Sequence, residues 1–137
     1  ARWTSGEWAE ANVLLMARCQ GRCESCGQPL NQDRYTSRIA NQTVRHHRQR
    51  RGVGGDRLSN LLLLHSGCHT DLHAHPEQSR DRGLIVTTYG EGGPPDPAQV
   101  PLTTPLYPAG VLLDDIGTAH PSDTVRPPEP DGDTDAP

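Results

Sequence analysis

Cys23-Glu24-Ser25-Cys26 and His65-Ser66-Gly67-Cys68 are the two stretches of this sequence that decide its fold. Each carries two ligand-type side chains separated by two residues, and two such pairs can surround one tetrahedral zinc ion. The turn of the first pair also leaves backbone amides free to bond the sulfurs. We therefore predict a structural zinc site with the ligands Cys23, Cys26, His65 and Cys68. The sequence leaves open whether the nearby Cys19 replaces His65 as the fourth ligand.

The composition explains why a metal ion is expected. The chain has 137 residues, enough for one modest domain, but only 32% of them are hydrophobic and none is Phe. A core with so little apolar mass is marginal, and a bound metal would add stability. We see no signal-peptide pattern, and the aliphatic runs at 61–64 and 84–86 are too short to cross a bilayer. We therefore expect a cytoplasmic protein with reduced thiols and no membrane partner.

Charge is distributed unevenly along the chain. Residues 1–90 hold 12 Arg and 8 acidic residues, whereas residues 91–137 hold one Arg and 9 acidic residues, and the overall net charge is −4. The first part is therefore basic, and Arg suits phosphate because its guanidinium can form two parallel hydrogen bonds. We expect contacts to nucleic-acid phosphates, with a solvated basic face as the alternative, from Arg45, Arg48, Arg50, Arg51 and Arg57.

Capping residues and periodicity predict the helices and strands. Thr4 and Glu7 have the spacing of a capping box, which predicts a helix over residues 5–17. Further predicted elements are a weakly extended segment at 36–48, a flexible loop at 51–55, strands at 61–65, 84–89 and 110–116, and helices at 69–75 and 76–83.

The same patterns divide the chain into four parts. They are an N-terminal helix (1–18), a core domain (19–90), an extension with one strand (91–117) and a disordered acidic tail (118–137). The composition changes sharply near residue 90, because 11 of the 13 prolines follow it. The tail has too little apolar mass to offset the entropy of ordering.

Four histidines lie close to the second zinc pair or between the two pairs. His69 and His73 are four residues apart, which places them on one face of a helix. His46 and His47 are neighbours on an expected strand and should point to opposite sides. We therefore expect different roles for the last two, one ligating a cation and the other accepting a proton from water.

Taken together, these motifs resemble a known family. His46-His47, Asn60 and Cys68-His69-x-x-x-His73, with the CxxC pair before them, resemble the HNH endonucleases that have a ββα-metal core. Five strings are similar to HNH proteins encoded by actinobacterial bacteriophages: RHHRQRRGVGG (45–55), LSNLLLL (58–64), HAHP (73–76), RGLIV (82–86) and VLLDDIG (111–117). The resemblance covers about residues 19–116. One departure is His65, where this group normally has cysteine, although zinc also accepts imidazole.

The resemblance implies the fold class, which is α+β. The expected fold has a small ββα-metal core with a zinc-knuckle clasp (the four zinc ligands), an N-terminal helix and a Pro/Gly/Asp-rich C-terminal tail. The resemblance also implies a metal-dependent endonuclease that nicks or cuts DNA and leaves 5′-phosphate and 3′-hydroxyl ends. DNA is the implied partner. By analogy alone, a phage setting adds terminase subunits as partners in the host cytoplasm.

Site residues follow from the same resemblance. His47 would be the general base, and His46, His69 and His73 would ligate a catalytic divalent ion such as Mg²⁺, Mn²⁺ or Ni²⁺. Asn60 would brace the loop between the two strands and so orient His47. The ion would polarise the scissile phosphate and stabilise the leaving 3′ oxygen.

Two other functions compete with this interpretation. A non-catalytic zinc-stabilised module that binds DNA or protein would need the cysteines, but neither the His46-His47 pair nor Asn60. A zinc hydrolase acting on another substrate usually has Glu after the first helix histidine, where this chain has Thr70. Acidic residues 121–137 either compete with DNA for the arginines or only aid solubility. The sequence leaves open the oligomeric state and the preferred DNA site.

Overall fold

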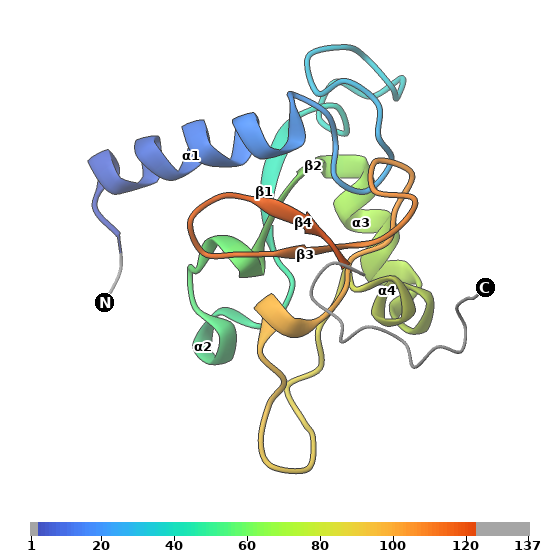
Figure 1. The fold of residues 1–137 in the computed structure, drawn as a ribbon. Helices are drawn as coiled ribbons and strands as arrows, with labels where there is room; N and C mark the ends of the chain where they lie inside the picture. The colour runs from blue at the N-terminus through green and yellow to red at the C-terminus, as the bar shows by residue number, and fades with distance from the viewer. Residues whose placement is uncertain (1–2, 123–137) are drawn as a thin grey trace, which may run out of the picture.

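The structure of the protein, a computed structural model, describes residues 3–122. It is an α+β fold that contains helices and two separate two-stranded antiparallel sheets (Figure 1). In chain order the elements are α1 (Ser5–Cys19), β1 (Thr43–His47), α2 (Arg51–Gly54), η1 (Leu58–Asn60), β2 (Leu61–His65), α3 (Ser66–Ala74), α4 (Pro76–Arg82), η2 (Pro97–Gln99), β3 (Val111–Leu113) and β4 (Ala119–Pro121). No helix in the described range is long and apolar enough to cross a membrane.

The centre of the fold is a ββα unit made of β1, β2 and α3. β1 and β2 pair antiparallel, with His46 opposite Leu62 and Thr43 opposite His65. α3 begins directly after β2 and packs against both strands. Every residue of β2 is buried, and this strand also contacts α1. The unit therefore places the histidine pair of β1 next to the helix that carries His69 and His73.

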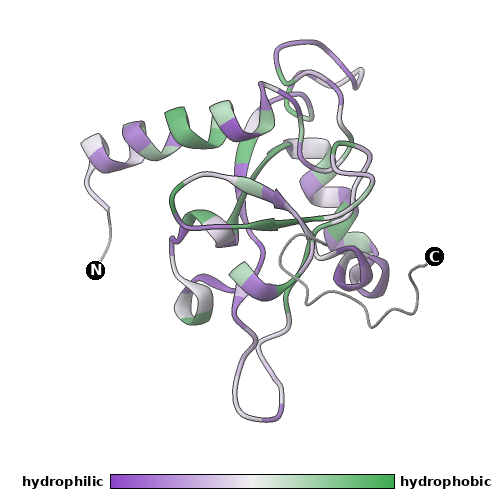
Figure 2. Cartoon of the chain, in the orientation of Figure 1, coloured by the Kyte–Doolittle hydropathy of each residue, from purple (hydrophilic) through white to green (hydrophobic). Residues whose placement is uncertain are grey.

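α1 forms as the sequence predicts and covers β2. The Thr4 hydroxyl accepts a hydrogen bond from the Glu7 amide, and the Glu7 carboxylate accepts one from the Thr4 amide, so the capping box is confirmed. The helix ends at Cys19, two residues beyond its predicted end. Leu15 is fully buried on the inner face of α1. Figure 2 shows how hydropathy is distributed over the described residues, with hydrophobic residues along β2 and β3 and hydrophilic residues along α4.

A buried ion pair connects α1, the CxxC turn and β2. The Arg18 guanidinium donates to both carboxylate oxygens of Glu24, at 2.8 and 3.0 Å, and neither side chain is exposed. Glu24 also accepts from the Leu63 amide at 3.0 Å and from the Tyr107 hydroxyl at 2.6 Å. Because both charges are paired and hydrogen-bonded, the cost of burying them is offset, and the CxxC turn is held against β2.

The strand predicted at 84–89 is wrong. The amides of Leu84 and Ile85 both donate to the carbonyl of Ser79 in the middle of α4. The amide of Val86 donates to the carbonyl of Arg48, just beyond β1. Leu84 and Val86 are therefore buried without forming a ladder, and the segment runs irregularly along the edge of the ββα unit.

Four other expectations need correction. The loop predicted at 51–55 contains the helical turn α2, and the extended segment predicted at 36–48 contains a strand only over β1. The strand predicted at 110–116 is the shorter β3, which pairs with β4 at residues where we expected a disordered tail. Pairing with β3 and the contact of His120 with Asp114 order β4, although the strand carries no large apolar side chain. The remainder of the predicted tail, 123–137, lies outside the described residues.

Arg48 is not a phosphate contact, contrary to the sequence-based prediction. Its side chain is 1% exposed, and burial lowers its pKa to about 10. The guanidinium donates at 2.8–3.0 Å to four backbone carbonyls, those of Ser59, Gly83, Pro97 and Val100. Local sequence cannot reveal these partners because three of them lie more than 30 residues away. Arg48 instead fixes segment 83–100 against the ββα unit.

Candidate functional site

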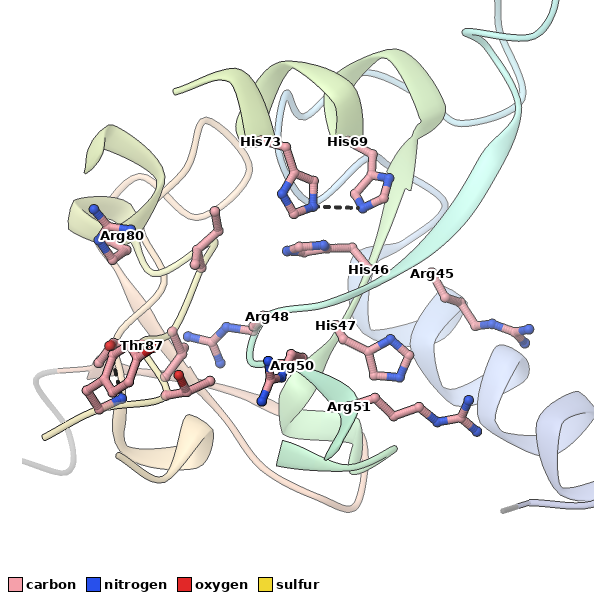
Figure 3. Close-up of a pocket in the computed structure, with 14 residues that line it drawn as sticks. Arg45, His46, His47, Arg48, Arg50, Arg51, His69, His73, Arg80 and Thr87 are labelled. Carbon is pink, nitrogen blue, oxygen red and sulfur yellow. Dashed lines mark hydrogen bonds between the residues drawn. The ribbon is translucent and has the colours of Figure 1, made fainter. Parts of the chain in front are cut away.

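A cavity of about 740 Å³ opens beside the ββα unit. β1, α3, α4 and the segment 85–89 contribute to its walls (Figure 3). Among the residues that the structure describes, no Asp or Glu lines it. Its ionisable lining consists of histidines and arginines, namely Arg45, His46, His47, Arg48, Arg50, Arg51, His69, His73 and Arg80, together with the phenol of Tyr89.

Three of the histidines converge on one point. His46 comes from β1, His69 and His73 come from α3, and one ring nitrogen of each lies within 4.8 Å of the other two. The Nε2 atoms of His69 and His73 are 3.2 Å apart, and the His46 ring faces both (Figure 3). Its centroid lies 5.0 Å from that of His69 and 5.4 Å from that of His73. The fold thus gathers three residues that the sequence predicted as metal ligands.

The ring of His46 is held in one orientation and one protonation state. Its Nε2 lies 2.8 Å from the carbonyl oxygen of Leu84, and since a carbonyl can only accept, Nε2 carries the hydrogen. Burial, reinforced by the nearby His69 and His73, lowers the pKa of His46 to about 3. The ring is therefore neutral near pH 7, and its Nδ1 has a free lone pair. An imidazole whose other nitrogen donates to a backbone carbonyl is the usual form of a metal-ligating histidine.

His47 lies on the other side of β1, as alternation along a strand requires. Its ring points away from the three-histidine cluster (Figure 3). Its Nε2 lies 2.8 Å from Oδ1 of Asp56, and the other carboxylate oxygen accepts from Arg51 at 3.1 Å. Burial tends to raise the pKa of Asp56, but the hydrogen bonds from His47 and Arg51 outweigh it and the pKa lies below its usual range.

Sequence reasoning missed Asp56, although a signal was present. Asp56 is the only acidic residue between Asp33 and Asp71, and it follows the Gly-rich stretch after the histidine pair. An isolated carboxylate among so many cationic side chains indicates a specific partner. Its distance of nine residues from His47 concealed which partner that is.

Asn60 connects the end of β1 to the turn that carries Asp56. Its Oδ1 accepts from the Gln49 amide at 2.7 Å, and its Nδ2 donates to the carbonyls of Gln49 and Gly55 at 2.8 and 2.9 Å. A Cβ on Gly54 would lie 2.6 Å from this Nδ2, so only glycine allows such close packing. The fully buried Asn60 therefore fixes the loop between β1 and β2 on the side of His47.

The predicted phosphate-binding arginines divide into two groups. Arg45, Arg50 and Arg51 line the cavity, and Arg45 also lies 3.9 Å above the ring of Trp8. Arg57 does not line it, because its guanidinium binds Asp96 and Asp115 at 2.8 and 2.9 Å. Its phosphate contact therefore stays a prediction from the sequence, and Arg57 is not part of the cavity.

Arg80 was not predicted but lines the cavity. It is exposed on α4, across the cavity from α2 (Figure 3). The sequence carries no local signal for it, since only the packing of α4 after α3 brings this side chain to the cavity that the histidines also line.

The predicted zinc ligands also come together. One ligand atom each from Cys23, Cys26, His65 and Cys68 lies within 4.8 Å of the others, and we call this group the Cys3His cluster. His65 Nδ1 lies 3.5 Å from the Cys26 sulfur and 3.9 Å from the Cys68 sulfur. A tetrahedral zinc ion would separate sulfur and nitrogen ligands by roughly 3.6 Å, so the geometry fits.

Surrounding polar groups prepare the Cys3His cluster for a cation. The amides of Ser25 and Cys26 donate to the Cys23 sulfur at 3.4 Å. A hydrogen bond from Cys68 lowers the pKa of Cys23 to about 4. His65 Nε2 lies 3.1 Å from the Pro29 carbonyl, so this nitrogen carries the hydrogen and Nδ1 faces the sulfurs.

Cys19 lies outside the Cys3His cluster, which answers the question left open by the sequence. It is 1% exposed, and its thiol donates to the Met16 carbonyl within α1 at 3.7 Å. Burial raises the pKa of this thiol. Among the described residues, His65 is therefore the fourth member of the cluster.

Comparisons with protein-family models, with curated proteins and with solved structures gave no match to this chain.

Replacing Cys68 by Ala tests the Cys3His cluster. We expect the wild-type protein to hold about one zinc ion per chain and Cys68→Ala to lose it and to melt at a much lower temperature. Structural zinc contributes about 10–16 kcal/mol of binding free energy to folding. Elemental analysis measures the zinc, and circular dichroism follows the melting. Cys19→Ala is the matched control and should retain its zinc; loss of zinc in the control alone would contradict this ligand set.

Proposed function

We propose that the protein is a metal-dependent HNH endonuclease that hydrolyses DNA phosphodiester bonds. One observation carries the proposal. Three imidazoles, from His46, His69 and His73, converge on a single point in a cavity that is lined by arginines and by no carboxylate among the described residues. Three neutral imidazoles leave the positive charge of a bound divalent cation uncompensated. That charge and the neighbouring arginines would together attract an anionic substrate such as a DNA phosphate. The sequence resemblance to HNH enzymes and the ββα unit add support.

The donor set favours particular metals. Imidazole nitrogen suits Ni²⁺, Zn²⁺ and similar transition-metal ions, whereas Mg²⁺ prefers oxygen ligands. His46 offers Nδ1, because its Nε2 is occupied by the Leu84 carbonyl. His69 and His73 offer the Nε2 atoms that face each other. When bound, a divalent ion would polarise the scissile phosphate and stabilise the leaving 3′ oxygen.

His47 is the proposed general base. It lines the same cavity as His46, His69 and His73, but its ring points away from them. A metal ion held by those three histidines would therefore leave His47 available to act on water. It would remove one proton from the attacking water as the oxygen bonds to phosphorus and the bond to the 3′ oxygen breaks. Asn60 would contribute indirectly, since it fixes the loop beside His47.

Four arginines are the proposed phosphate contacts: Arg45, Arg50, Arg51 and Arg80. Arg50 and Arg80 are exposed, and within the described range neither has an acidic partner. Such contacts bind the DNA backbone without reading its sequence. We therefore propose binding that depends strongly on salt and only weakly on base sequence.

Plasmid cleavage tests the proposed function. Zinc-loaded protein is incubated with supercoiled DNA in Mn²⁺, Ni²⁺, Mg²⁺ or EDTA, and nicked and linear products are measured on gels. We expect metal-dependent cleavage, with His47→Ala slower by about 10²–10⁴-fold, the usual contribution of a general base. His75→Ala is the control, because this exposed histidine lies outside the cavity.

Two outcomes would contradict the proposal. If folded, zinc-loaded wild-type protein cuts no DNA with any of these metals, the non-catalytic zinc-stabilised binding module is favoured instead. If His47→Ala cuts as fast as His75→Ala, the enzyme has a different base.

Arg80→Ala tests the phosphate contacts. Loss of one such contact should weaken DNA binding and reduce the slope of log K against log salt by about 1. Fluorescence anisotropy with a labelled duplex at several salt concentrations measures both. Arg82→Ala is the matched control, since Arg82 is exposed on the same helix but does not line the cavity. Equal slopes for the two variants would exclude Arg80 as a specific phosphate contact.

A further inference from the structure

The carboxylate of Asp56 is held at both oxygens. Oδ1 accepts from His47 and Oδ2 accepts from Arg51, and the side chain is only 8% exposed. Arg51 is the first residue of α2, and Asp56 directly follows Gly55, which caps the C-terminal end of that helix. The two hydrogen bonds therefore close a compact loop in which the acid faces back toward β1.

The position of Asp56 is fixed through its neighbour Gly55. The Gly55 carbonyl accepts from Asn60, and the Gly55 amide donates to the Arg51 carbonyl. Gly55 has φ +72°, a conformation that favours glycine. These contacts leave the loop little freedom to move the carboxylate away from His47.

The acid determines which nitrogen of His47 carries the hydrogen. An ionised carboxylate only accepts, so the hydrogen of the neutral ring lies on Nε2, and Nδ1 keeps its lone pair. Among the residues that the structure describes, none bonds this Nδ1. The His47 side chain is 26% exposed, which allows water to reach it.

We propose that Asp56 is a positioning residue that acts through His47, a role that rests on the proposed nuclease function. Asp56 fixes the His47 ring with the hydrogen on Nε2, so that Nδ1 is the atom that accepts the proton from the attacking water. After that transfer both ring nitrogens carry hydrogen, and the carboxylate stabilises the imidazolium without becoming protonated. The oxygen of the water forms the new bond to phosphorus, and the electrons of the broken bond leave with the 3′ oxygen.

A double-mutant cycle separates this role from a purely structural one. With saturating DNA and metal, Asp56→Asn should slow cleavage about 10²-fold or more with little change in DNA affinity. In a His47→Ala background the same substitution should change the remaining rate by less than about twofold, because the group it positions is gone. A similar loss in both backgrounds would overturn the proposal. Asp81→Asn, an exposed acid on α4, is the matched control.

Nitrogen NMR tests the proposal without any cleavage. In wild-type zinc-loaded protein at mildly alkaline pH, long-range proton–nitrogen spectra distinguish a protonated from an unprotonated ring nitrogen. The His47 signals are assigned by their loss in His47→Gln. We expect the hydrogen on Nε2; a hydrogen on Nδ1 would overturn the proposal even if Asp56→Asn failed to fold. Wild-type protein that cuts no DNA would instead overturn the nuclease function, so the two failures are distinguishable.

Discussion

The Cys3His cluster is the constraint on which the rest of the structure depends. His65 ends β2 and caps α3, and Cys68 lies in the first turn of that helix, so a metal bound there would fix the angle between strand and helix. On the other side, the CxxC turn holds the buried Glu24, which binds Arg18 of α1. A chain with 32% hydrophobic residues cannot rely on its apolar core alone. His69 and His73 follow on α3, and their positions therefore depend on this cluster.

Hydrogen bonds to the ring nitrogens prepare three histidines for different tasks. His65 donates to the Pro29 carbonyl and His46 donates to the Leu84 carbonyl, which leaves Nδ1 of each free for a metal. His47 instead donates to Asp56, whose charge suits a ring that becomes cationic. In the proposed function, two carbonyls and one carboxylate would thus separate the metal-ligating histidines from the general base. Neither carbonyl accepts a backbone hydrogen bond in the described part of the chain, so each is available to a histidine.

Sequence spacing was sufficient to predict three local arrangements. The xx-spaced ligand pairs, the capping box of α1 and the four-residue interval between His69 and His73 all have the expected structural consequence. Long-range packing was not accessible in the same way. The apolar residues after Gly83 fit a strand, but their amides are taken by Ser79 and Arg48. Arg48 itself resembles its exposed neighbours in the sequence, and only the folded chain reveals the carbonyls that bury it.

The most direct test of the account is a crystal structure grown with Ni²⁺, with anomalous diffraction recorded at the zinc and nickel edges. We expect zinc in the Cys3His cluster and nickel bound by Nδ1 of His46 and by Nε2 of His69 and His73, with the Leu84 contact intact. Nickel bound through His47, or no nickel at the three histidines, would contradict the central claim that the fold prepares His46, His69 and His73 as a metal centre.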